Sequence, residues 1–456
     1  MRNNESVILE QILRNYRDRS VKSRKLWNEA IACMPSGSTR SSVFYAPYPS
    51  YAKKASGSQI EDVDGNRRID YCYNFTSLIM GHQHPAVTKA IRNQLENGTV
   101  FGAPTELEVI HSSTLKSRMR SLDKVRYTVS GTEACMFAVR LARAFTNKKK
   151  IAKFEGGYHG TSDFASVSVH PNSPGTVKKI AAVVDTAGLL PEIVENTIVM
   201  PFNDFDTTSS IVRKYRNSLA CIIVEPIMRG ISPLRDFLPS MRELADELDI
   251  PLVFDEVITG FRISPGGAQE KYRVRPDLTV MGKIIGGGFP IGAIGGREDI
   301  MSMMAQGSEF PRPSGSKVPH AGTFNAHPIT LAAGLATLKE LTADVYKELD
   351  QSAEEIRTSL TKIISDLGVN VQCTGVGSLF DVVFTGKRII DYKSHHTGNL
   401  LLRRCFDLDL LNRGVFMPPT HFGCTSAVTK HEEIDTSLQA MKDTLTLLLP
   451  LARNKK

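Results

Sequence analysis

The sequence has no apolar run long enough to cross a membrane. A membrane-spanning helix needs about 20 consecutive apolar residues, and none of the 456 residues begins such a stretch. The first 25 residues alternate charged with apolar side chains and lack the hydrophobic core of a signal peptide. These absences argue against a membrane protein or a secreted one, and they favour a cytoplasmic location.

Cysteine pairs with the spacing of a redox or zinc site are also absent. The chain has seven cysteines, and none belongs to a C-x-x-C motif. Most lie among apolar neighbours, as Cys221 does, and are expected to behave as small buried apolar side chains. We therefore predict reduced thiols in a reducing compartment, and no metal site.

Charge of one sign is not concentrated anywhere along the chain. Lysine and arginine number 56 against 48 acidic residues, for a net charge of +8. The only basic runs are short, at 148–150 and 453–456. This scatter predicts a solvated basic surface rather than a nucleic-acid-binding one. With 41% hydrophobic and 23% charged residues, the chain has the composition of a folded globular protein.

Two common phosphate-binding fingerprints are missing. A P-loop ends in Gly-Lys-Ser or Gly-Lys-Thr, but Ile284 follows Lys283 here, and Asp277 stands where the loop needs its first glycine. No G-x-G-x-x-G motif follows the first strand of the alternating region either. These absences exclude a P-loop nucleotidase and a dinucleotide-binding domain of the usual type.

The pattern that is present is an alternation of short apolar strands with helices. Helical spacing predicts one N-terminal helix within 7–34, and Asp64-Gly65 predicts a hairpin turn. Strands are expected at 125–129, 151–154, 221–224, 251–254, 278–281, 291–294 and 376–384. Helices are expected at 85–96, 133–145, 240–248, 329–341, 351–367, 400–412 and 432–449.

This order predicts an α/β fold with a mainly parallel sheet covered by helices on both faces. We place a large domain at residues 80–326. A small α+β domain is expected to combine residues 1–79 with residues 327–456, because both chain ends have short strands among their helices.

Four segments place reactive side chains directly after predicted strands. Ser130-Gly131-Thr132 begins a helix, where free N–H groups bind phosphate, although the same residues also suit an ordinary helix cap. Gly157-Tyr158-His159-Gly160 presents a ring that can stack on a flat ligand, or forms an ordinary glycine-rich turn. Ligands of open α/β sheets bind at this edge.

Two further strands end in an acid and in a lysine. Asp255 follows a buried strand and either caps a helix or meets a cation, such as a protonated ring nitrogen. Lys283 lies between an apolar strand and three glycines, where partial burial makes an amine nucleophilic and able to form a Schiff base. A phosphate cradle, a stacking ring, a buried acid and such a lysine together suit pyridoxal 5′-phosphate (PLP).

The chain resembles the class III, fold-type I PLP-dependent aminotransferases over nearly its whole length. The resemblance rests on eight segments in order. They are Asp62-Val63-Asp64-Gly65-Asn66, Gly81-His82-Gln83-His84-Pro85, Ser130-Gly131-Thr132-Glu133-Ala134, Gly157-Tyr158-His159-Gly160, Val224-Glu225-Pro226, Phe254-Asp255-Glu256-Val257, Gly282-Lys283-Ile284-Ile285-Gly286-Gly287-Gly288 and Gly322-Thr323-Phe324.

The resemblance implies a role for each matching residue. Lys283 resembles the catalytic Schiff-base lysine, and Asp255 resembles the acid that pairs with the pyridinium nitrogen. Thr323 resembles a residue that reaches the phosphate from the neighbouring subunit, which implies a homodimer with active sites at the interface. The remaining cofactor-binding positions by this resemblance are Ser130, Gly131, Thr132, Tyr158, His159, Glu225 and Val257.

Within the family, two subgroups are similar to different parts of the chain. Phe261-Arg262 and Gly266-Gly267-Ala268-Gln269 resemble glutamate-1-semialdehyde 2,1-aminomutases. The segment 38–49 looks more like β-amino-acid aminotransferases of the β-phenylalanine type, in which the arginine matching Arg40 binds a substrate carboxylate. The resemblance therefore makes Arg40, Thr76 and Thr420 the candidate substrate-binding residues.

The chain departs from both subgroups. It has Asn74-Phe75-Thr76-Ser77 where the aminomutases have a Ser-Trp-Gly-Pro-like stretch, and it lacks their acid near Gly423. It also has Thr420 where the β-amino-acid aminotransferases have a second arginine, which weighs against 2-oxoglutarate as acceptor.

The departures from the aminomutases favour transamination, in which an amino group moves from a carboxylate-bearing amino acid, expected to be a β-amino acid, to an oxo acid. Intramolecular aminomutation and racemization or epimerization remain alternatives on the same scaffold. A non-catalytic PLP-fold protein is a fourth, which the presence of Lys283 and Asp255 disfavours. Neither nucleic acid nor a membrane is expected as a partner.

Overall fold

The computed structural model describes residues 2–171, 180–311 and 314–452. Its contacts divide the chain into two compact units. Unit 1 comprises Met1–His84, Lys347–Arg388 and Thr397–Lys456, and unit 2 comprises Pro85–Tyr346 and Ile389–His396. The sequence suggested divisions at residues 79 and 326, whereas the chain returns to unit 1 only after residue 346, because α12 (Pro328–Glu340) packs against α4 (Pro85–Glu96) within unit 2.

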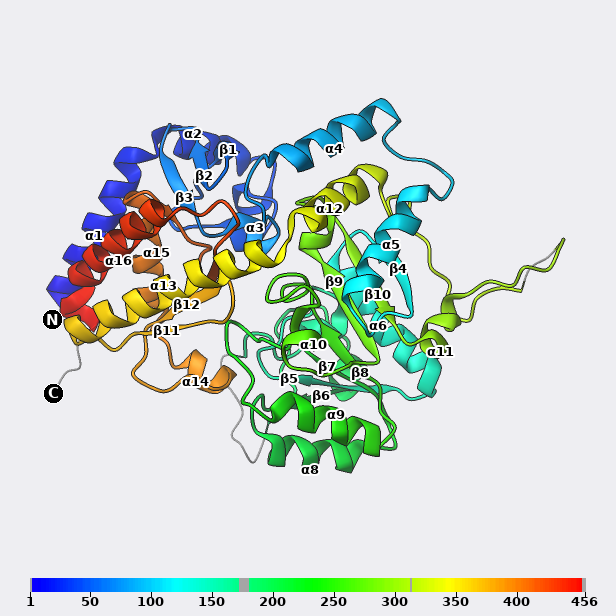
Figure 1. Cartoon of the computed structure of the whole chain (residues 1–456). Helices are drawn as coiled ribbons and strands as arrows, with labels where there is room; N and C mark the ends of the chain where they lie inside the picture. The colour runs from blue at the N-terminus through cyan, green and yellow to red at the C-terminus, as the bar shows by residue number, and fades with distance from the viewer. Residues whose placement is uncertain (1, 172–179, 312–313, 453–456) are drawn as a thin grey trace. The chain divides into compact units, whose positions relative to one another are not determined.

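Unit 2 is built on a seven-stranded sheet (Figure 1). The mainly parallel α/β arrangement predicted from the sequence is confirmed, but the strand at 197–200 was not among the six predicted there. Its strand order is β4-β10-β9-β8-β7-β5-β6. The strands are β4 (Lys124–Thr128), β5 (Lys150–Phe154), β6 (Thr197–Met200), β7 (Leu219–Val224), β8 (Leu252–Asp255), β9 (Leu278–Gly282) and β10 (Gly292–Gly296). All neighbouring pairs from β9 to β6 are parallel, and only β10 runs antiparallel to its two neighbours, β4 and β9.

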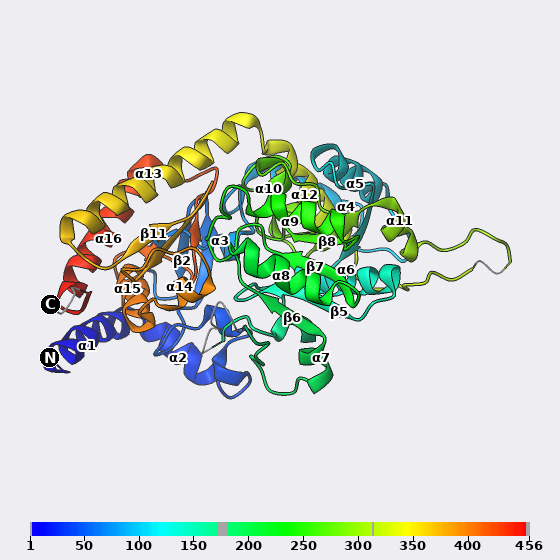
Figure 2. The same ribbon diagram turned by 90° about the horizontal axis from the view of Figure 1, so that it is seen from below.

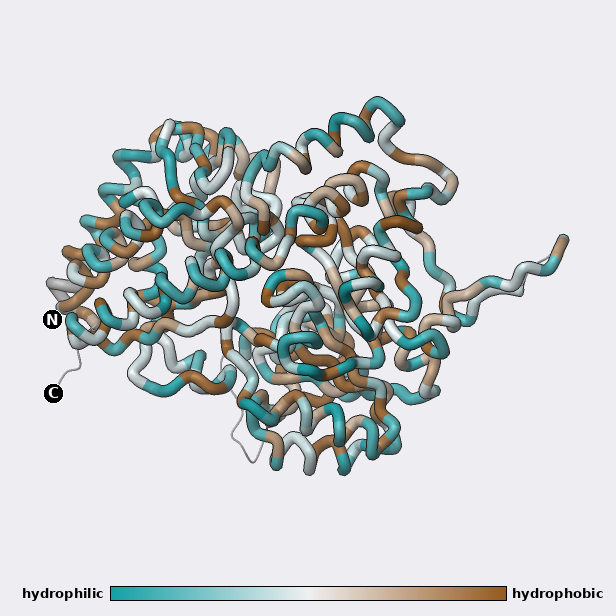
Figure 3. The backbone as a smooth tube through the Cα atoms, viewed as in Figure 1, coloured by the Kyte–Doolittle hydropathy of each residue, from teal (hydrophilic) through white to brown (hydrophobic). Residues whose placement is uncertain are grey.

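Helices cover both faces of this sheet, because successive side chains of a strand point to opposite faces. In β7, Cys221 and Ile223 belong to the cluster that includes α6 (Gly131–Thr146), while Ile222 and Val224 belong to the cluster that includes α9 (Phe237–Glu247). Figure 3 shows hydrophobic colouring along the central strands of this unit. The other helices of unit 2 are α5 (Glu106–Arg118), α7 (Pro191–Glu195), α8 (Phe205–Tyr215), α10 (Gly267–Lys271), α11 (Glu298–Met301) and α14 (Tyr392–His396).

Unit 1 combines two small sheets with long helices from both chain ends. The sheets have the orders β1-β2-β3-β13 and β11-β12-β14. Their strands are β1 (Ala52–Ser56), β2 (Gln59–Asp62), β3 (Arg67–Asp70), β11 (Gln372–Thr374), β12 (Leu379–Val383), β13 (Val415–Phe416) and β14 (Gly423–Cys424). The helices are α1 (Arg2–Arg19), α2 (Val21–Ala30), α3 (Tyr73–Thr76), α15 (Leu400–Asn412), α16 (His431–Ala452) and all but the first turn of α13 (Ala343–Leu367).

The single helix expected within 7–34 is wrong, because the chain forms α1 and α2 with a break at Ser20. Ser20 is buried, and its hydroxyl bonds to the Tyr16 carbonyl and lies 3.0 Å from the Tyr48 hydroxyl. These contacts hold Ser20 in a backbone conformation that is not helical, with φ −132° and ψ 40°. The hairpin at Asp64-Gly65 is confirmed, since β2 pairs antiparallel with β3 across it.

Candidate active site

The sequence-predicted reactive residues of unit 2 follow four adjacent strands of its sheet. These four strands are parallel: β5, β7, β8 and β9. Tyr158 follows β5 and Glu225 follows β7. Asp255 is the last residue of β8, and Lys283 follows β9. Parallel strands carry their carboxyl ends at one edge, which is where open α/β sheets bind ligands. The topology therefore brings four segments, up to 125 residues apart in the chain, to the same edge (Figures 1 and 2).

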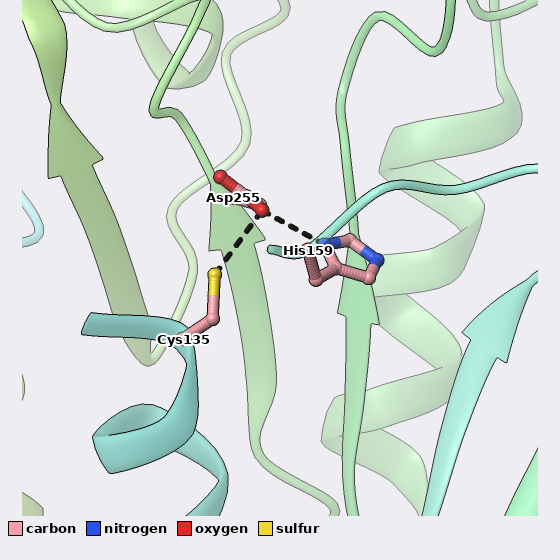
Figure 4. A group of neighbouring side chains, drawn as sticks. All are labelled: Cys135, His159 and Asp255. Atoms are coloured by element: carbon pink, nitrogen blue, oxygen red, sulfur yellow. Dashed lines mark hydrogen bonds and ion pairs between the residues drawn. The ribbon is translucent and has the colours of Figure 1, made fainter. Parts of the chain in front are cut away.

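Asp255 ends β8 and is held by three donors. Its Oδ2 accepts a hydrogen bond from His159 Nδ1 at 2.8 Å and one from the Cys135 thiol at 3.3 Å. Its Oδ1 accepts one from the Val257 backbone N–H at 3.1 Å. Figure 4 shows Cys135 and His159 approaching the carboxylate from different segments. The Cys135 sulfur, a His159 ring nitrogen and an Asp255 oxygen lie within 4.8 Å of one another, as metal ligands would, and the two side-chain hydrogen bonds account for that closeness without an ion.

The environment of His159 favours its neutral form. Burial lowers the pKa of His159, and the bond to Asp255 offsets this only in part. A carboxylate accepts but does not donate, so the proton of the neutral ring lies on Nδ1. The opposite nitrogen, Nε2, is buried without a hydrogen-bond partner. His159 therefore orients Asp255 without cancelling its negative charge.

The start of α6 forms a tight cradle beside Asp255. Ser130 caps the helix by accepting a hydrogen bond from Glu133 N at 3.2 Å. A side chain at Gly131 would place its Cβ 2.9 Å from Val257, and one at Gly160 would lie 2.4 Å from the Thr132 hydroxyl. Only glycine lets these segments approach so closely, and the first turn of a helix offers N–H groups to an anion.

Lys283 and Glu225 complete the described edge. Lys283 directly follows β9, is partly buried, and has a backbone φ of 52°, which non-glycine residues adopt mainly under constraint. Glu225 accepts a hydrogen bond from the Tyr158 backbone N–H at 2.7 Å. Burial, and then the charge of Asp255, raises the pKa of Glu225 to about 8, while Lys283 and other positive groups oppose that rise.

Glu225 is expected to make the free energy of unfolding depend on pH. Its pKa is raised on folding, from 4.5 to about 8. The stabilisation of the folded protein by protonated Glu225 is therefore complete below pH 4.5, and it is lost as the pH rises through 8. We expect urea unfolding of the cofactor-free protein to show decreasing stability from pH 5 to 9, and Glu225→Gln to reduce that slope. Glu96→Gln, at an exposed carboxyl, should keep it. If stability depends on pH in Glu225→Gln as it does in the wild type, Glu225 is ionised in the folded protein over the whole range from pH 5 to 9.

Tyr158 and Thr323 are more exposed than the rest of the predicted set. Tyr158 is 48% exposed. Thr323 is exposed in a turn that precedes α12.

Unit 1 holds the three candidate substrate-binding residues. Arg40 donates to the Asn74 side-chain oxygen at 2.9 Å and lies over the Phe75 ring, 5.4 Å from its centroid. Arg40 and Thr420 both line a cavity of about 1050 Å³ whose wall is otherwise largely apolar. Thr76 is buried at 3% exposure and does not line this cavity.

Sequence reasoning missed Cys135 and Asn74. Cys135 was interpreted only as a buried apolar thiol. The available signal was its spacing: it lies four residues after Gly131, one turn into a helix whose start was predicted to bind phosphate. Asn74 was noted as a departure from the aminomutases, but no local signal connects it to Arg40, 34 residues earlier.

Comparison with known proteins identifies the family. The family model "Aminotransferase class-III" matches residues 41–445. A glutamate-1-semialdehyde 2,1-aminomutase from Methanothermobacter thermautotrophicus is 40% identical over 431 residues, covering 93% of this chain and 99% of that protein. A solved omega-transaminase from Sphaerobacter thermophilus is 37% identical with a TM-score of 0.87, covering 93% of this chain and 97% of that one.

A solved beta-phenylalanine aminotransferase from Variovorax paradoxus is 29% identical with a TM-score of 0.87 and covers 99% of this chain and 100% of that one. A further solved transaminase with PLP bound is 34% identical with a TM-score of 0.86 and covers 95% and 99% of the two chains. The resemblance, the fold-type I architecture and the PLP cofactor expected from the sequence are thus confirmed.

The residues described above suit this cofactor: a glycine cradle at a helix start, a buried carboxylate for a ring nitrogen, and a lysine at the next strand end. Among the helices of the described residues, none is both long and apolar enough to span a membrane. The chain is a PLP-dependent enzyme and belongs to the class-III aminotransferase family.

Proposed function

We propose that this enzyme moves the amino group of a substrate that carries a carboxylate. The arrangement of Asp255 and Lys283 at adjacent strand ends supports the amino-group chemistry. Arg40, which contacts Asn74 and Phe75, supports the proposal that the substrate carries a carboxylate. A guanidinium binds a carboxylate through two parallel hydrogen bonds.

Two side chains carry the proton and charge in this proposal. When bound, PLP supplies an electrophilic carbonyl carbon and a ring that withdraws electrons. The Nζ of Lys283 takes the proton from the carbon that bears the substrate's amino group and returns it elsewhere, as general base and then acid. The Asp255 carboxylate keeps a proton on the ring nitrogen, and His159 and Cys135 hold that carboxylate in place.

Two variants of the reaction have separate support. Relatives named as aminomutases, at 40% identity, favour intramolecular exchange over the transamination expected from the sequence. The solved omega-transaminase, at 37% identity, and this chain's Asn74-Phe75-Thr76-Ser77 segment support transamination. Transamination needs an acceptor and releases an oxo product, whereas aminomutation does neither.

A product assay distinguishes the variants. We expect the purified holoenzyme either to convert glutamate 1-semialdehyde to its 2,1-exchanged isomer without an acceptor, or to release an oxo acid from 3-aminobutanoate when pyruvate is present. With Thr420 in place of a second arginine, pyruvate should serve at least as well as 2-oxoglutarate. Product identification by mass spectrometry decides between them. Racemization of a single amino acid, with neither product, would contradict both variants.

We also propose that the enzyme works as a homodimer in the cytoplasm. The exposed Thr323 suits a contact with the phosphate bound by a second copy. In both views the segment after α11 extends away from unit 2, and it carries Phe310, which is 96% exposed (Figures 1 and 2). A large apolar side chain so exposed fits a protein interface. None of the seven cysteines, all of which lie in the described residues, forms a disulfide, which suits a reducing compartment.

Mixing two defective variants tests the role of Thr323. Thr323→Ala should weaken PLP binding by about 10-fold or more through loss of a charged hydrogen bond. If Thr323 acts across subunits, a dimer of one Thr323→Ala chain and one Lys283→Ala chain contains one intact site. Activity at limiting PLP should therefore return on mixing. Mixtures no more active than the separate variants would place Thr323 in its own subunit's site or outside any site.

A further inference from the structure

The turn that contacts Arg40 has an unusual backbone. The four residues of α3, Tyr73, Asn74, Phe75 and Thr76, have φ angles of 41°, 48°, 54° and 74°. Residues other than glycine adopt this left-handed conformation at a cost of roughly 1–2 kcal/mol each, and usually singly. A run of four therefore persists only where surrounding groups enforce it, which is characteristic of functional sites.

Buried groups of unit 1 enforce this turn. The Asp70 carboxylate, 1% exposed, accepts hydrogen bonds from the backbone N–H groups of Cys72 at 2.7 Å and Tyr73 at 2.9 Å. The other oxygen of Asp70 lies 2.7 Å from His82 Nε2. The Phe75 N–H donates to the Cys72 sulfur at 3.4 Å. The turn is thus held from its N-terminal side, and Asn74 is left exposed at its centre.

The held turn presents two groups to one guanidinium. The Asn74 side-chain oxygen accepts from Arg40 at 2.9 Å, and the Phe75 ring lies under the same guanidinium at 5.4 Å. Phe75 is itself positioned by an edge contact with His421, 6.0 Å between ring centroids. Within the described part of the chain, no carboxylate lies at ion-pair distance from Arg40. One of its five N–H donors is used by a neutral partner, so the positive charge is oriented but not neutralised.

We propose that Asn74 and Phe75 are positioning residues that orient Arg40 to bind the substrate carboxylate, and that the neutrality of Asn74 sets this specificity. The proposal rests on the proposed function of Arg40. An asparagine fixes the guanidinium without competing for its charge. An aspartate in its place would form an ion pair with Arg40 and occupy the site intended for the substrate carboxylate.

Two substitutions at position 74 separate these effects without altering the backbone. Asp and Gly both accept left-handed φ angles, so neither Asn74→Asp nor Asn74→Gly strains the turn. Asn74→Gly removes the oxygen that orients Arg40, whereas Asn74→Asp adds a competing charge in nearly the same shape. Phe75→Leu removes the ring face and keeps an apolar side chain.

The experiment compares two amino donors that differ only in the carboxylate. They are 3-aminobutanoate and 2-aminopropane, assayed with wild-type holoenzyme, the three variants and Arg40→Ala. For 3-aminobutanoate we expect KM to rise about 10- to 100-fold in Asn74→Asp, and about 2- to 10-fold in Asn74→Gly and Phe75→Leu. For 2-aminopropane, KM should stay within about twofold in every variant, because no interaction with Arg40 is involved.

Calorimetric binding of butanoate to the holoenzyme provides a second readout that needs no turnover. Its Kd should follow the same order, and Asn93→Asp, which makes the same charge change at an exposed site of α4, should leave it unchanged.

The outcomes separate the two proposals. If Arg40→Ala leaves butanoate binding unchanged, the carboxylate role of Arg40 and this inference both fail. If Arg40→Ala weakens butanoate binding but Asn74→Asp binds as the wild type does, only the positioning role is overturned. Equal losses in Asn74→Asp and Asn74→Gly would overturn the role assigned to neutrality.

Discussion

Lys283→Ala is expected to abolish turnover while the protein still binds PLP. The amine of Lys283 is the group that moves the proton in the proposed reaction, and such a group contributes about 10²–10⁴-fold, or more when it also bonds covalently to the cofactor. Binding should persist because the start of α6 and Asp255 belong to other segments. Turnover rates and the PLP retained after gel filtration measure the two effects.

A surface lysine in the same unit provides the control for this substitution. Lys271→Ala, at an exposed position of α10, should retain wild-type turnover. Borohydride treatment should fix PLP to the wild type and to Lys271→Ala but not to Lys283→Ala. Fixation of the cofactor in Lys283→Ala would assign the Schiff base to another lysine, and near-normal turnover would remove Lys283 from catalysis.

Asp255→Asn is expected to lower turnover by about 10²–10³-fold, the usual loss for one electrostatic group at a reacting centre. The amide keeps the shape, and its oxygen can still accept from His159 and Cys135. Its NH2 group cannot accept from the Val257 N–H, so we expect a loss of stability that is small beside the loss of turnover. It loses the negative charge that keeps a ring nitrogen protonated. Steady-state turnover and exchange of the substrate's carbon-bound hydrogen in D₂O should fall together.

The neighbouring acid, Glu256, separates catalysis from stability. Glu256 is also buried, but it accepts hydrogen bonds from the backbone N–H groups of Ala268 and Gln269 at the start of α10. Glu256→Gln should therefore lower the urea midpoint more than turnover, the reverse of Asp255→Asn. If Asp255→Asn loses stability and keeps turnover within a few-fold, Asp255 is only a structural acceptor.

Much of unit 2 was predictable because its signals are local. Most strands of the sheet are short apolar runs, and helical spacing predicts the bounds of α4 in this unit, as it does those of α15 in unit 1. The reactive residues lie immediately after those strands, so a parallel sheet places them at one edge wherever the rest of the chain lies. The break at Ser20 was not predictable, because it depends on Tyr48, 28 residues away.

The sequence by itself determined which residues stand at the strand ends: Lys283, Asp255 and the glycines that begin the cradle. Only the tertiary structure decided what surrounds them. The thiol of Cys135 reaches Asp255 from a helix 120 residues earlier, burial beside that carboxylate raises the pKa of Glu225 to about 8, and a left-handed turn brings Asn74 to Arg40. Spacing along the chain encodes the local geometry of strands and turns. Charge, protonation and orientation depend on distances in space, which the chain acquires only when it folds.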